Sequence, residues 1–358
     1  MSTELHPVPP PFEIKAPQAT PLLSVDRLKA YYKTKLFGID REVRAVDDVS
    51  LKISRNEIYG LAGESSSGKS SLIKTIAGAI RPPLRVVDGS VRFNFTDGER
   101  DIYKLSPHEL SEIRWSRLSY IMQGSMSVLN PVRRIKHAFP DFALPHVRVK
   151  GADFTRLVER HLKRVHLDPA VLQAYPHELS GGMRQRVTIA LATVCSPEFI
   201  IADEPTTALD VIVQKGVLSM VREIQQELGS SVLFVTHDMA VHANLTDRLG
   251  IMYAGRLVEE GRTRDVFRRP LHPYTAHLIS SLPRIGDEAP KKGLQGSPPS
   301  LADPPPGCRF HPRCPLAIDL CWREAPPMVE ILPGHRAACH VAQADPDRVE
   351  TVALGGES

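Results

Sequence analysis

The sequence predicts an α/β nucleotide-binding fold, and two observations carry that prediction. The segment Gly63–Ser70 reads GESSSGKS, which is the pattern G-x-x-x-x-G-K-[ST] of a phosphate-binding loop. It stands between Ile58–Ala62, an apolar run typical of a buried strand, and Ser71–Gly78, whose apolar residues have helical spacing. From Pro197 to about residue 262, short β-rich runs alternate with helical segments, which indicates a largely parallel sheet.

The phosphate-binding loop carries the first prediction about function. Backbone N–H groups of such a loop surround nucleotide phosphates, and the free N–H groups of the following helix add the positive end of its dipole. Lys69 is expected to neutralise charge on the outer phosphates, and the Ser70 hydroxyl is expected to ligate Mg²⁺. The residues expected to bind the nucleotide are Gly63, Ser65, Ser66, Ser67, Gly68, Lys69, Ser70 and Ser71.

Composition limits the class of protein. The chain has 358 residues, of which 42% are hydrophobic and 24% charged, as in ordinary globular proteins. A net charge of +4 is too small and dispersed to argue for a nucleic-acid partner. No apolar stretch approaches the roughly 18 to 20 residues that span a bilayer, and the first residues lack the features of a signal peptide. We therefore expect a cytosolic chain that reaches any membrane through partners.

The elements before the loop are predicted to be antiparallel strands. Leu22–Thr34 and Ala45–Gly63 alternate apolar and polar residues, as half-buried strands do. Residues 1–20 are rich in proline and are expected to form a tail.

The middle of the chain is predicted to be a helical insertion. Residues 106–190 lack strand alternation and contain helical spacing, as in Phe154–Leu167. The nucleotide-binding domain is expected to span residues 21–265. The sequence then becomes rich in Pro, Cys and His, which predicts a small Cys-rich C-terminal extension at 266–345 and a flexible tail at 346–358.

A second candidate site element is the acidic pair Asp203 and Glu204. It follows Phe199–Ala202, a buried-strand run, so both acids stand where doubly wound sheets place their active sites. Asp203 is expected to orient Mg²⁺, and Glu204 to polarise the water that attacks the γ-phosphate. An Asp-Glu pair after a strand more often belongs to a turn or the start of a helix. Here Ala208–Asp210 follows the pair, and His237 follows the next strand, which favours the catalytic interpretation.

The ordered motifs resemble those of ATP-binding-cassette (ABC) ATPases. LSGGMRQR at Leu179–Arg186 is similar to the signature of that family, and IIADEP follows at Ile200–Pro205. The resemblance covers residues 22–345. It implies an ABC-type P-loop NTPase fold, with a RecA-like core, an antiparallel β subdomain and an α-helical insertion. It also implies ATP hydrolysis with ATP and Mg²⁺, and a catalytic group of Glu204, His237, Gln123 and Lys69.

Further roles are implied by the same resemblance. His237 resembles the switch histidine that contacts the γ-phosphate, and Gln123 the glutamine that reaches Mg²⁺ and the attacking water. Mg²⁺ would be held through Ser70, Gln123 and Asp203. Tyr32 is expected to stack on adenine, with Tyr31 as the competing choice, because strand alternation lets only one of the two face the nucleotide.

Two residues depart from the family pattern. Ser66 and Gly124 stand where relatives commonly carry Gly and Asp, and for Ser66 we expect slightly altered loop geometry without loss of binding.

The signature residues are expected to serve another chain. In ABC proteins, residues matching Ser180, Gly181 and Gly182 cap the γ-phosphate held by the opposite subunit, because the N-terminus of a helix suits an anion. The resemblance therefore implies a head-to-tail dimer that ATP closes and hydrolysis opens.

The downstream sequence resembles the oligopeptide/dipeptide (and nickel) permease ATPases. The evidence is an EEG turn followed by HPYT within Leu257–Pro283, together with MSVLNP at Met126–Pro131. The resemblance implies a peripheral subunit at the cytoplasmic face of the membrane that powers peptide import. Its partners would be a second ABC ATPase, as a heterodimer, two permease subunits and an extracytoplasmic peptide-binding protein. The alternatives are a nickel or other small-solute importer and a soluble ABC ATPase without a permease.

Cysteine usage predicts a metal site in the extension. Four of the five cysteines, Cys308, Cys314, Cys321 and Cys339, lie within a short Pro-rich segment, and disulfides are disfavoured in a reducing cytosol. Four thiolates suit zinc or an iron–sulfur cluster. The spacings are wider than usual zinc pairs, and similar tails of peptide-permease ATPases carry a [4Fe–4S] centre, so the cluster is preferred over zinc and over unligated thiols. Cys195 is expected to be a core residue.

Overall fold

The computed structural model describes residues 20–36, 38–124, 128–207, 210–282 and 294–349. The predicted tail at 1–19, the end of the chain at 350–358, part of MSVLNP, and Ala208 and Leu209 lie outside the described residues. Within the described ranges, none of the helices is both long and apolar enough to cross a bilayer.

The N-terminal part forms the predicted antiparallel sheet. Its four strands have the order β2-β1-β4-β5, and β1 pairs with both β2 and β4. The strands are β1 (Leu23–Leu36), β2 (Ile39–Ile53), β4 (Leu84–Phe95) and β5 (Gly98–Asp101). Alternating apolar residues of these strands are buried, which is why the period-2 pattern identified β1 and the second half of β2. The prediction of antiparallel strands over Ala45–Gly63 was wrong at its end, because Ile58–Ala62 is β3, a parallel strand of the larger sheet.

The larger sheet has eight strands in the order β11-β12-β10-β9-β3-β8-β7-β6. Neighbouring strands from β9 to β6 run parallel, as predicted, and β10, β12 and β11 continue the sheet as antiparallel strands. The strands are β3 (Ile58–Ala62), β6 (Leu118–Ile121), β7 (Phe199–Asp203), β8 (Ser231–Val235), β9 (Arg248–Tyr253), β10 (Arg256–Arg262), β11 (Val329–Leu332) and β12 (His335–Ala337). β6 lies inside the segment expected to be helical.

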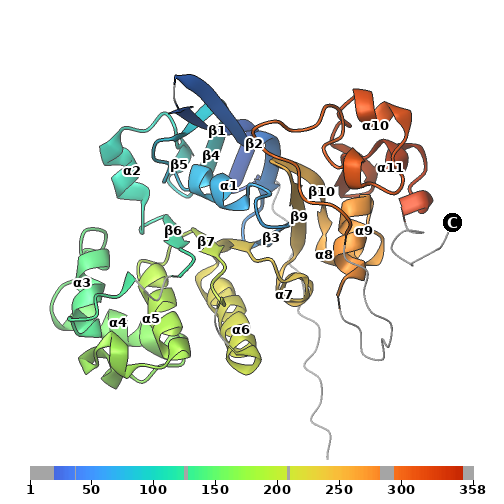
Figure 1. The fold of residues 1–358 in the computed structure, drawn as a ribbon. Helices are drawn as coiled ribbons and strands as arrows, with labels where there is room; N and C mark the ends of the chain where they lie inside the picture. The colour runs from blue at the N-terminus through green and yellow to red at the C-terminus, as the bar shows by residue number, and fades with distance from the viewer. Residues whose placement is uncertain (1–19, 37, 125–127, 208–209, 283–293, 350–358) are drawn as a thin grey trace, which may run out of the picture.

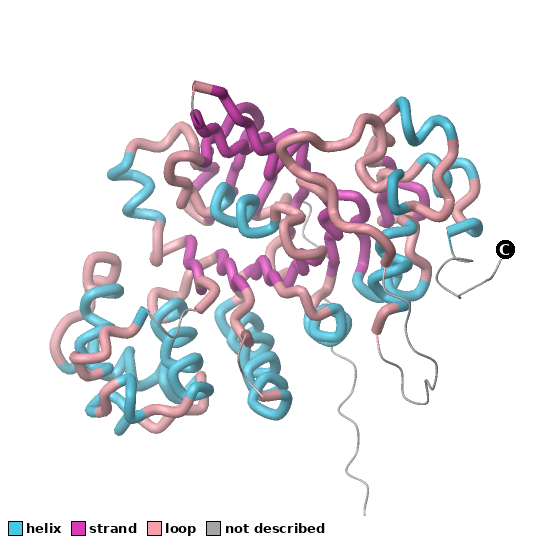
Figure 2. Tube along the Cα trace, viewed as in Figure 1, coloured by secondary structure: helices cyan, strands magenta, loops and turns pink. Residues whose placement is uncertain are grey.

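Helix α1 (Lys69–Ile76) packs between the two sheets (Figures 1 and 2). Its residues Leu72, Ile73 and Ile76 are buried in one cluster with residues of both sheets. This packing fixes the start of α1, and with it the phosphate-binding loop, against the ends of the parallel strands.

The middle of the chain forms a separate helical lobe, drawn in green in Figure 1. It contains α3 (Ala138–Ala143), α4 (Ala152–Arg164) and α5 (Gly181–Thr193), and α6 (Val211–Leu228) packs against it. A short helix, α2 (Pro107–Ile113), begins at Ser106, whose side chain accepts a hydrogen bond from Glu109 N.

The C-terminal segment, residues 263–349 where described, is joined to the larger sheet through β12, which pairs with β10 at Glu259↔Ala337 and Glu260↔Arg336. Its helices are α8 (Thr263–Arg268), α9 (Pro273–Ser280), α10 (Asp319–Arg323) and α11 (His340–Ala344), and α7 (Met239–Leu245) precedes it. Phe310, Tyr274 and Val266 are buried in a cluster with residues of β9 and β10. The segment therefore shares a hydrophobic core with the larger sheet.

Candidate nucleotide-binding and catalytic site

Two glycines allow the phosphate-binding loop to pack closely against neighbouring backbone. Gly63 has φ +149 and Gly68 has φ +101, in the region that favours glycine. A Cβ atom on Gly68 would lie 2.0 Å from the Ala45 carbonyl oxygen, and one on Gly63 would lie 2.2 Å from that of Met252. Both positions therefore require glycine, because backbone atoms fill the space that a side chain would need.

Lys69 lies folded into the loop. Its Nζ donates hydrogen bonds to the carbonyl oxygens of Gly63 (2.6 Å) and Glu64 (2.8 Å) and to Ser67 Oγ (3.3 Å). Burial lowers the pKa of Lys69, and the nearby charges of Glu204 and Asp203 act in the opposite direction. The lysine of the loop and the acids at the end of β7 therefore belong to one electrostatic site.

The loop serines divide into two groups. Ser65, Ser66 and Ser70 are exposed, whereas Ser67 and Ser71 are buried. Ser66 has φ +65, so this serine takes the left-handed conformation that the more usual glycine would adopt without strain. The serine that replaces the usual glycine at position 66 therefore has a strained backbone conformation.

The residues predicted to be catalytic meet around Glu204. Its Oε2 accepts a hydrogen bond from Gln123 Nε2 at 2.9 Å, and its Oε1 lies 3.1 Å from His237 Nδ1. The three residues come from the ends of β6, β7 and β8, which are neighbouring parallel strands. Glu204 has φ +46, a strained value for a non-glycine residue, and its N–H donates to the Val235 carbonyl at 2.8 Å.

The pKa values of the Glu204 and Asp203 carboxyl groups are shifted in opposite directions. Burial acts to raise the pKa of Glu204, but hydrogen bonds from His237 and Thr207 outweigh it, so this pKa lies below its ordinary value. Burial raises the pKa of Asp203 above its ordinary value, although Tyr120 opposes the shift. Glu204 is accordingly an ionised acceptor, and His237 Nδ1 is the donor of their hydrogen bond.

Sequence reasoning missed two residues that contact this pair of acids. Tyr120 Oη donates to Asp203 Oδ2 at 3.1 Å, and Thr207 Oγ1 donates to Glu204 Oε2 at 3.0 Å. Tyr120 lies on β6 opposite Ile201 on β7. This position places it near Asp203, but it can be recognised only once the pairing of the two strands is known.

The two candidate tyrosines on β1 have different environments. Tyr31 is buried, and its hydroxyl donates to Asp47 Oδ1. Tyr32 is half-buried, and its Oη lies 3.1 Å from Ser71 Oγ at the start of α1. Of the two tyrosines, only Tyr32 is partly exposed to solvent and contacts the start of α1 beside the phosphate-binding loop.

The signature residues begin α5 in the helical lobe. Ser180 caps the helix, with its Oγ accepting from Met183 N at 3.3 Å, and Gly181 and Gly182 form the first turn. Ser180 is exposed, and a Cβ on Gly182 would meet Val213 Cγ1 at 2.7 Å. α5 and α1 belong to different lobes (Figure 1).

The structure does not support the predicted four-cysteine metal site. Among the described residues, which include all four cysteines, no group of three or more Cys, His, Asp or Glu side chains is placed to hold a metal ion. Burial raises the pKa of Cys314 to about 12 and that of Cys339 to about 11, which favours protonated thiols. The physical reason is that apolar packing accommodates these thiols: Cys308 and Cys314 pack against the cluster containing Phe310, and Cys339 lies in another.

Cys195 is half-buried at the core of the helical lobe, and burial raises the pKa of its thiol to about 11.

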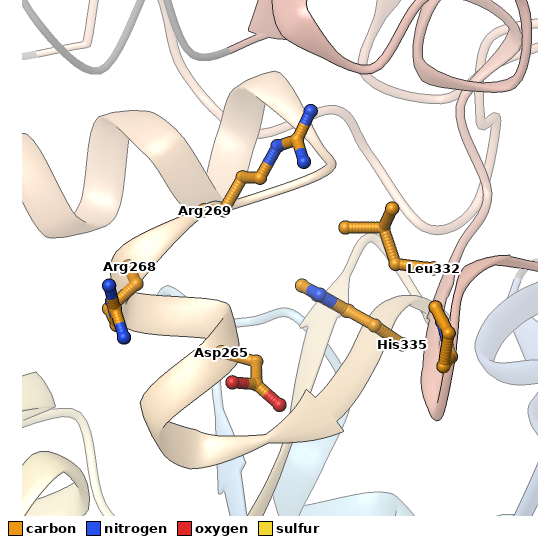
Figure 3. A pocket seen from close by; sticks show the side chains of 6 residues that line it. Asp265, Arg268, Arg269, Leu332 and His335 are labelled. Atoms are coloured by element: carbon orange, nitrogen blue, oxygen red, sulfur yellow. The ribbon is translucent and has the colours of Figure 1, made fainter.

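A cavity of about 330 Å³ lies apart from this site, between α8 and the β11–β12 turn (Figure 3). Figure 3 shows the His335 ring between Asp265 and Leu332. None of the residues predicted to bind nucleotide or metal lines this cavity, whose lining residues are Asp265, Arg268, Arg269, Leu332, Pro333 and His335.

Comparison with known proteins finds similar proteins along most of the chain. A family model described as ABC transporter matches residues 46–207, and one described as oligopeptide/dipeptide transporter, C-terminal region, matches residues 258–321. The dipeptide transport ATP-binding protein of Caldanaerobacter subterraneus is 38% identical over 323 residues, which cover 89% of this chain and 97% of that protein. The oligopeptide transport ATP-binding protein of Escherichia coli is 39% identical over 325 residues, 90% of this chain and 94% of that protein.

A solved dimeric ATP-binding cassette in a post-hydrolysis state, bound to ADP and Pi, has the same fold. The TM-score is 0.58 at 24% sequence identity, and the match covers 68% of this chain and 99% of that one.

Proposed function

The chain belongs to the ABC transporter family, and we propose that it is the ATP-hydrolysing subunit that powers import of oligopeptides or dipeptides. The observation that carries the proposal is the meeting of Gln123, Glu204 and His237 beside the phosphate-binding loop. The substrate class is supported by the match of residues 258–321 to the oligopeptide/dipeptide transporter region and by the names of the relatives.

ATP would bind through the phosphate-binding loop, with Tyr32 stacking on adenine. Lys69 would exchange its hydrogen bonds to the Gly63 and Glu64 carbonyls for charge-assisted bonds to the outer phosphates. Ser70, Gln123 and Asp203 would hold Mg²⁺, and their hard oxygen donors suit that ion. When bound, Mg²⁺ would neutralise charge on the phosphates.

Glu204 would position and polarise the attacking water. Its lowered pKa keeps the carboxylate ionised at neutral pH, so it can accept a proton from water but cannot donate one. The bonds from His237 and Gln123 fix the direction of both carboxylate oxygens before the substrate arrives. Such pre-organisation matters because phosphoryl transfer depends mostly on positioning and charge stabilisation.

The site would be completed by a second ATP-binding chain. The exposed Ser180 and the adjoining glycines present the N-terminus of α5, a 13-residue helix, and this suits an anion held by another subunit. The functional unit would be a heterodimer of ATPases under two permease subunits, at the cytoplasmic face of the membrane, and fed by an extracytoplasmic peptide-binding protein.

The C-terminal cysteines would hold a [4Fe–4S] cluster, with zinc as the alternative. The support is that all four cysteines lie in the C-terminal segment, and that Cys308 N donates a hydrogen bond to the Cys321 carbonyl at 2.8 Å, which brings two of them together. Binding would require their deprotonation and a closer approach of the sulfurs. Iron and sulfide analysis of anaerobically purified protein tests this: about four irons per chain, lost in Cys314→Ser, support the cluster. Stoichiometric zinc without iron would overturn the cluster in favour of zinc, and four freely alkylated thiols would refute a metal site of either kind.

Transport by the reconstituted complex tests the function. Vesicles containing the permease subunits and both ATPase chains are supplied with binding protein and a labelled peptide, and peptide uptake is measured with and without ATP. We expect ATP-dependent uptake with the wild-type chain and its loss with Glu204→Gln. Uptake of nickel but not peptide, or ATP hydrolysis that needs no permease, would refute the proposal.

A further inference from the structure

Glu64, the second residue of the phosphate-binding loop, is held at three points. Its carbonyl oxygen accepts from Lys69 Nζ at 2.8 Å, its backbone N–H donates to Tyr274 Oη at 2.7 Å, and its carboxylate accepts two hydrogen bonds from Arg313. Lys69 is the lysine assigned to the phosphates. Before nucleotide binds, Glu64 therefore links this lysine to the residues that hold the Glu64 backbone and side chain.

Two of these three contacts come from the C-terminal segment. Arg313 Nη1 lies 2.9 Å from Glu64 Oε2, and Nη2 lies 3.2 Å from Oε1, which is the paired geometry that makes an arginine–carboxylate contact directional. The Arg313 side chain is only 7% exposed and the Glu64 side chain 25%, so water screens this pair less than a surface ion pair. Arg313 Nη1 also donates to Tyr253 Oη at 3.3 Å.

Packing fixes both donors. The rings of Tyr253 and Tyr274 lie 4.6 Å apart, and each packs against Phe310. These aromatic residues come from β9, α9 and the segment just before Arg313, and all are buried. The cluster thus places the Tyr274 hydroxyl and the Arg313 backbone relative to the end of β3, where the loop begins.

A second arginine of the same segment supports the other side of the loop. Arg309 donates to the Ala254 carbonyl and pairs with Asp47. Gly255, which follows Ala254, donates its N–H to the Ser67 carbonyl at 2.8 Å. Arg313 therefore contacts Glu64 directly, whereas Arg309 is connected to Ser67 only through residues 254 and 255.

We propose that Arg313 is a positioning residue for ATP: through Glu64 it holds the phosphate-binding loop in its nucleotide-binding conformation, so docking of the C-terminal segment controls ATP affinity. The proposal rests on the assignment of the loop as the ATP site. It assigns to residues 309–313 a role in nucleotide binding that requires no metal at the neighbouring cysteines.

A double-mutant cycle on the full chain tests it. Mg²⁺–ATP affinity is measured by calorimetry for wild type, Arg313→Ala, Glu64→Ala, the double variant, Arg313→Lys and Arg323→Ala. Arg323 is the matched control, because it is an exposed arginine of the same segment. We expect about 3- to 10-fold weaker binding in each single alanine variant, no further loss in the double variant, partial recovery with lysine and no change in the control.

Unfolding midpoints and proteolysis of the nucleotide-free variants separate positioning from loss of fold. Positioning predicts a higher KM for ATP in the assembled transporter at nearly unchanged kcat, with the C-terminal segment still protected from protease. Wild-type affinity in Arg313→Ala, or additive losses in the double variant, would overturn the inference. Absence of ATP binding by the wild-type chain would instead overturn the proposed function. If Arg313→Ala fails to fold, Glu64→Gln, which keeps the side-chain shape, gives the same comparison.

Discussion

At the scale of single residues, two non-glycine residues of the candidate site have strained backbone conformations. Ser66 and Glu204 both have positive φ values, and each belongs to a segment assigned to phosphate or water contact. Non-glycine residues in this region cost about 1–2 kcal/mol, which the surrounding packing must offset. The strain at Glu204 aims its carboxylate at Gln123 and His237, whereas the strain at Ser66 reproduces a loop shape that glycine would adopt freely.

Strain at Ser66 predicts opposite results for two neighbouring substitutions. Ser66→Gly removes the strained conformation and is expected to raise the free energy of unfolding by about 0.5–1 kcal/mol. Ser65→Gly is the matched control: Ser65 is also exposed in the loop but has no positive φ, so it is expected to lose about as much through chain entropy. Urea denaturation of both variants measures the difference. A loss of stability in Ser66→Gly would contradict the strain.

The hydrogen bond from Thr207 predicts a change in pH dependence. In the proposed mechanism, hydrolysis requires ionised Glu204. Its pKa lies below the ordinary value of 4.5, so we expect activity to be retained as pH falls and to be lost only as pH drops through the lowered value. Thr207→Val removes one bond that lowers this pKa. The acid limb of kcat/KM is expected to move to higher pH, and Thr34→Val, on an exposed face of β1, is expected to leave it in place. An unmoved limb in Thr207→Val would remove Thr207 from this role.

At the scale of elements, local pattern predicted the strands that bear the site. The run Ile58–Ala62 coincides with β3, and the run Phe199–Ala202 ends one residue before β7 does, because buried parallel strands are continuous apolar runs. The four residues of β6 were missed in a helical surrounding. β12 was missed because its partner β10 lies 78 residues earlier at Glu259↔Ala337, and no local pattern encodes that pairing.

The C-terminal pairing is stabilised by a buried carboxylate. Glu259 on β10 is fully buried and accepts from His335 Nε2 (2.8 Å), Leu271 N (2.8 Å) and His272 N (2.9 Å). His335 is the first residue of β12, the antiparallel neighbour of β10, and the two backbone donors lie just before α9. This carboxylate therefore joins two parts of the C-terminal segment to the larger sheet.

Removal of this acceptor is expected to be costly. Glu259→Ala leaves an imidazole and two backbone N–H groups buried without a partner, so we expect a loss of about 3 kcal/mol or more in the free energy of unfolding. Glu324→Ala, an exposed glutamate of the same segment, is the control and is expected to change stability by less than about 0.5 kcal/mol. Denaturant unfolding measures both. Equal effects in the two variants would show that Glu259 does not join the segment to the sheet.

At the scale of the whole molecule, the residues assigned to ATP hydrolysis lie in two places. The phosphate-binding loop and the acids meet at the ends of the parallel strands, whereas the signature lies at the start of α5 in the helical lobe (Figure 1). Motif order predicted both parts. The contact of Arg313 with Glu64, across 249 residues, could not be predicted because it depends on how the C-terminal segment packs.

The most direct test of the central claim, that a second ATP-binding chain completes the site, is the rate of ATP hydrolysis per chain in two states. The wild-type chain is assayed at concentrations where it is demonstrably monomeric, and then in the assembled transporter, with Glu204→Gln as the blank in each. We expect hydrolysis near the blank for the monomer and a rate at least about 100-fold above the blank in the transporter, since a positioned base contributes about 10²- to 10⁴-fold. Vigorous hydrolysis by the monomer, or equal rates for Glu204→Gln and wild type in the transporter, would contradict the account.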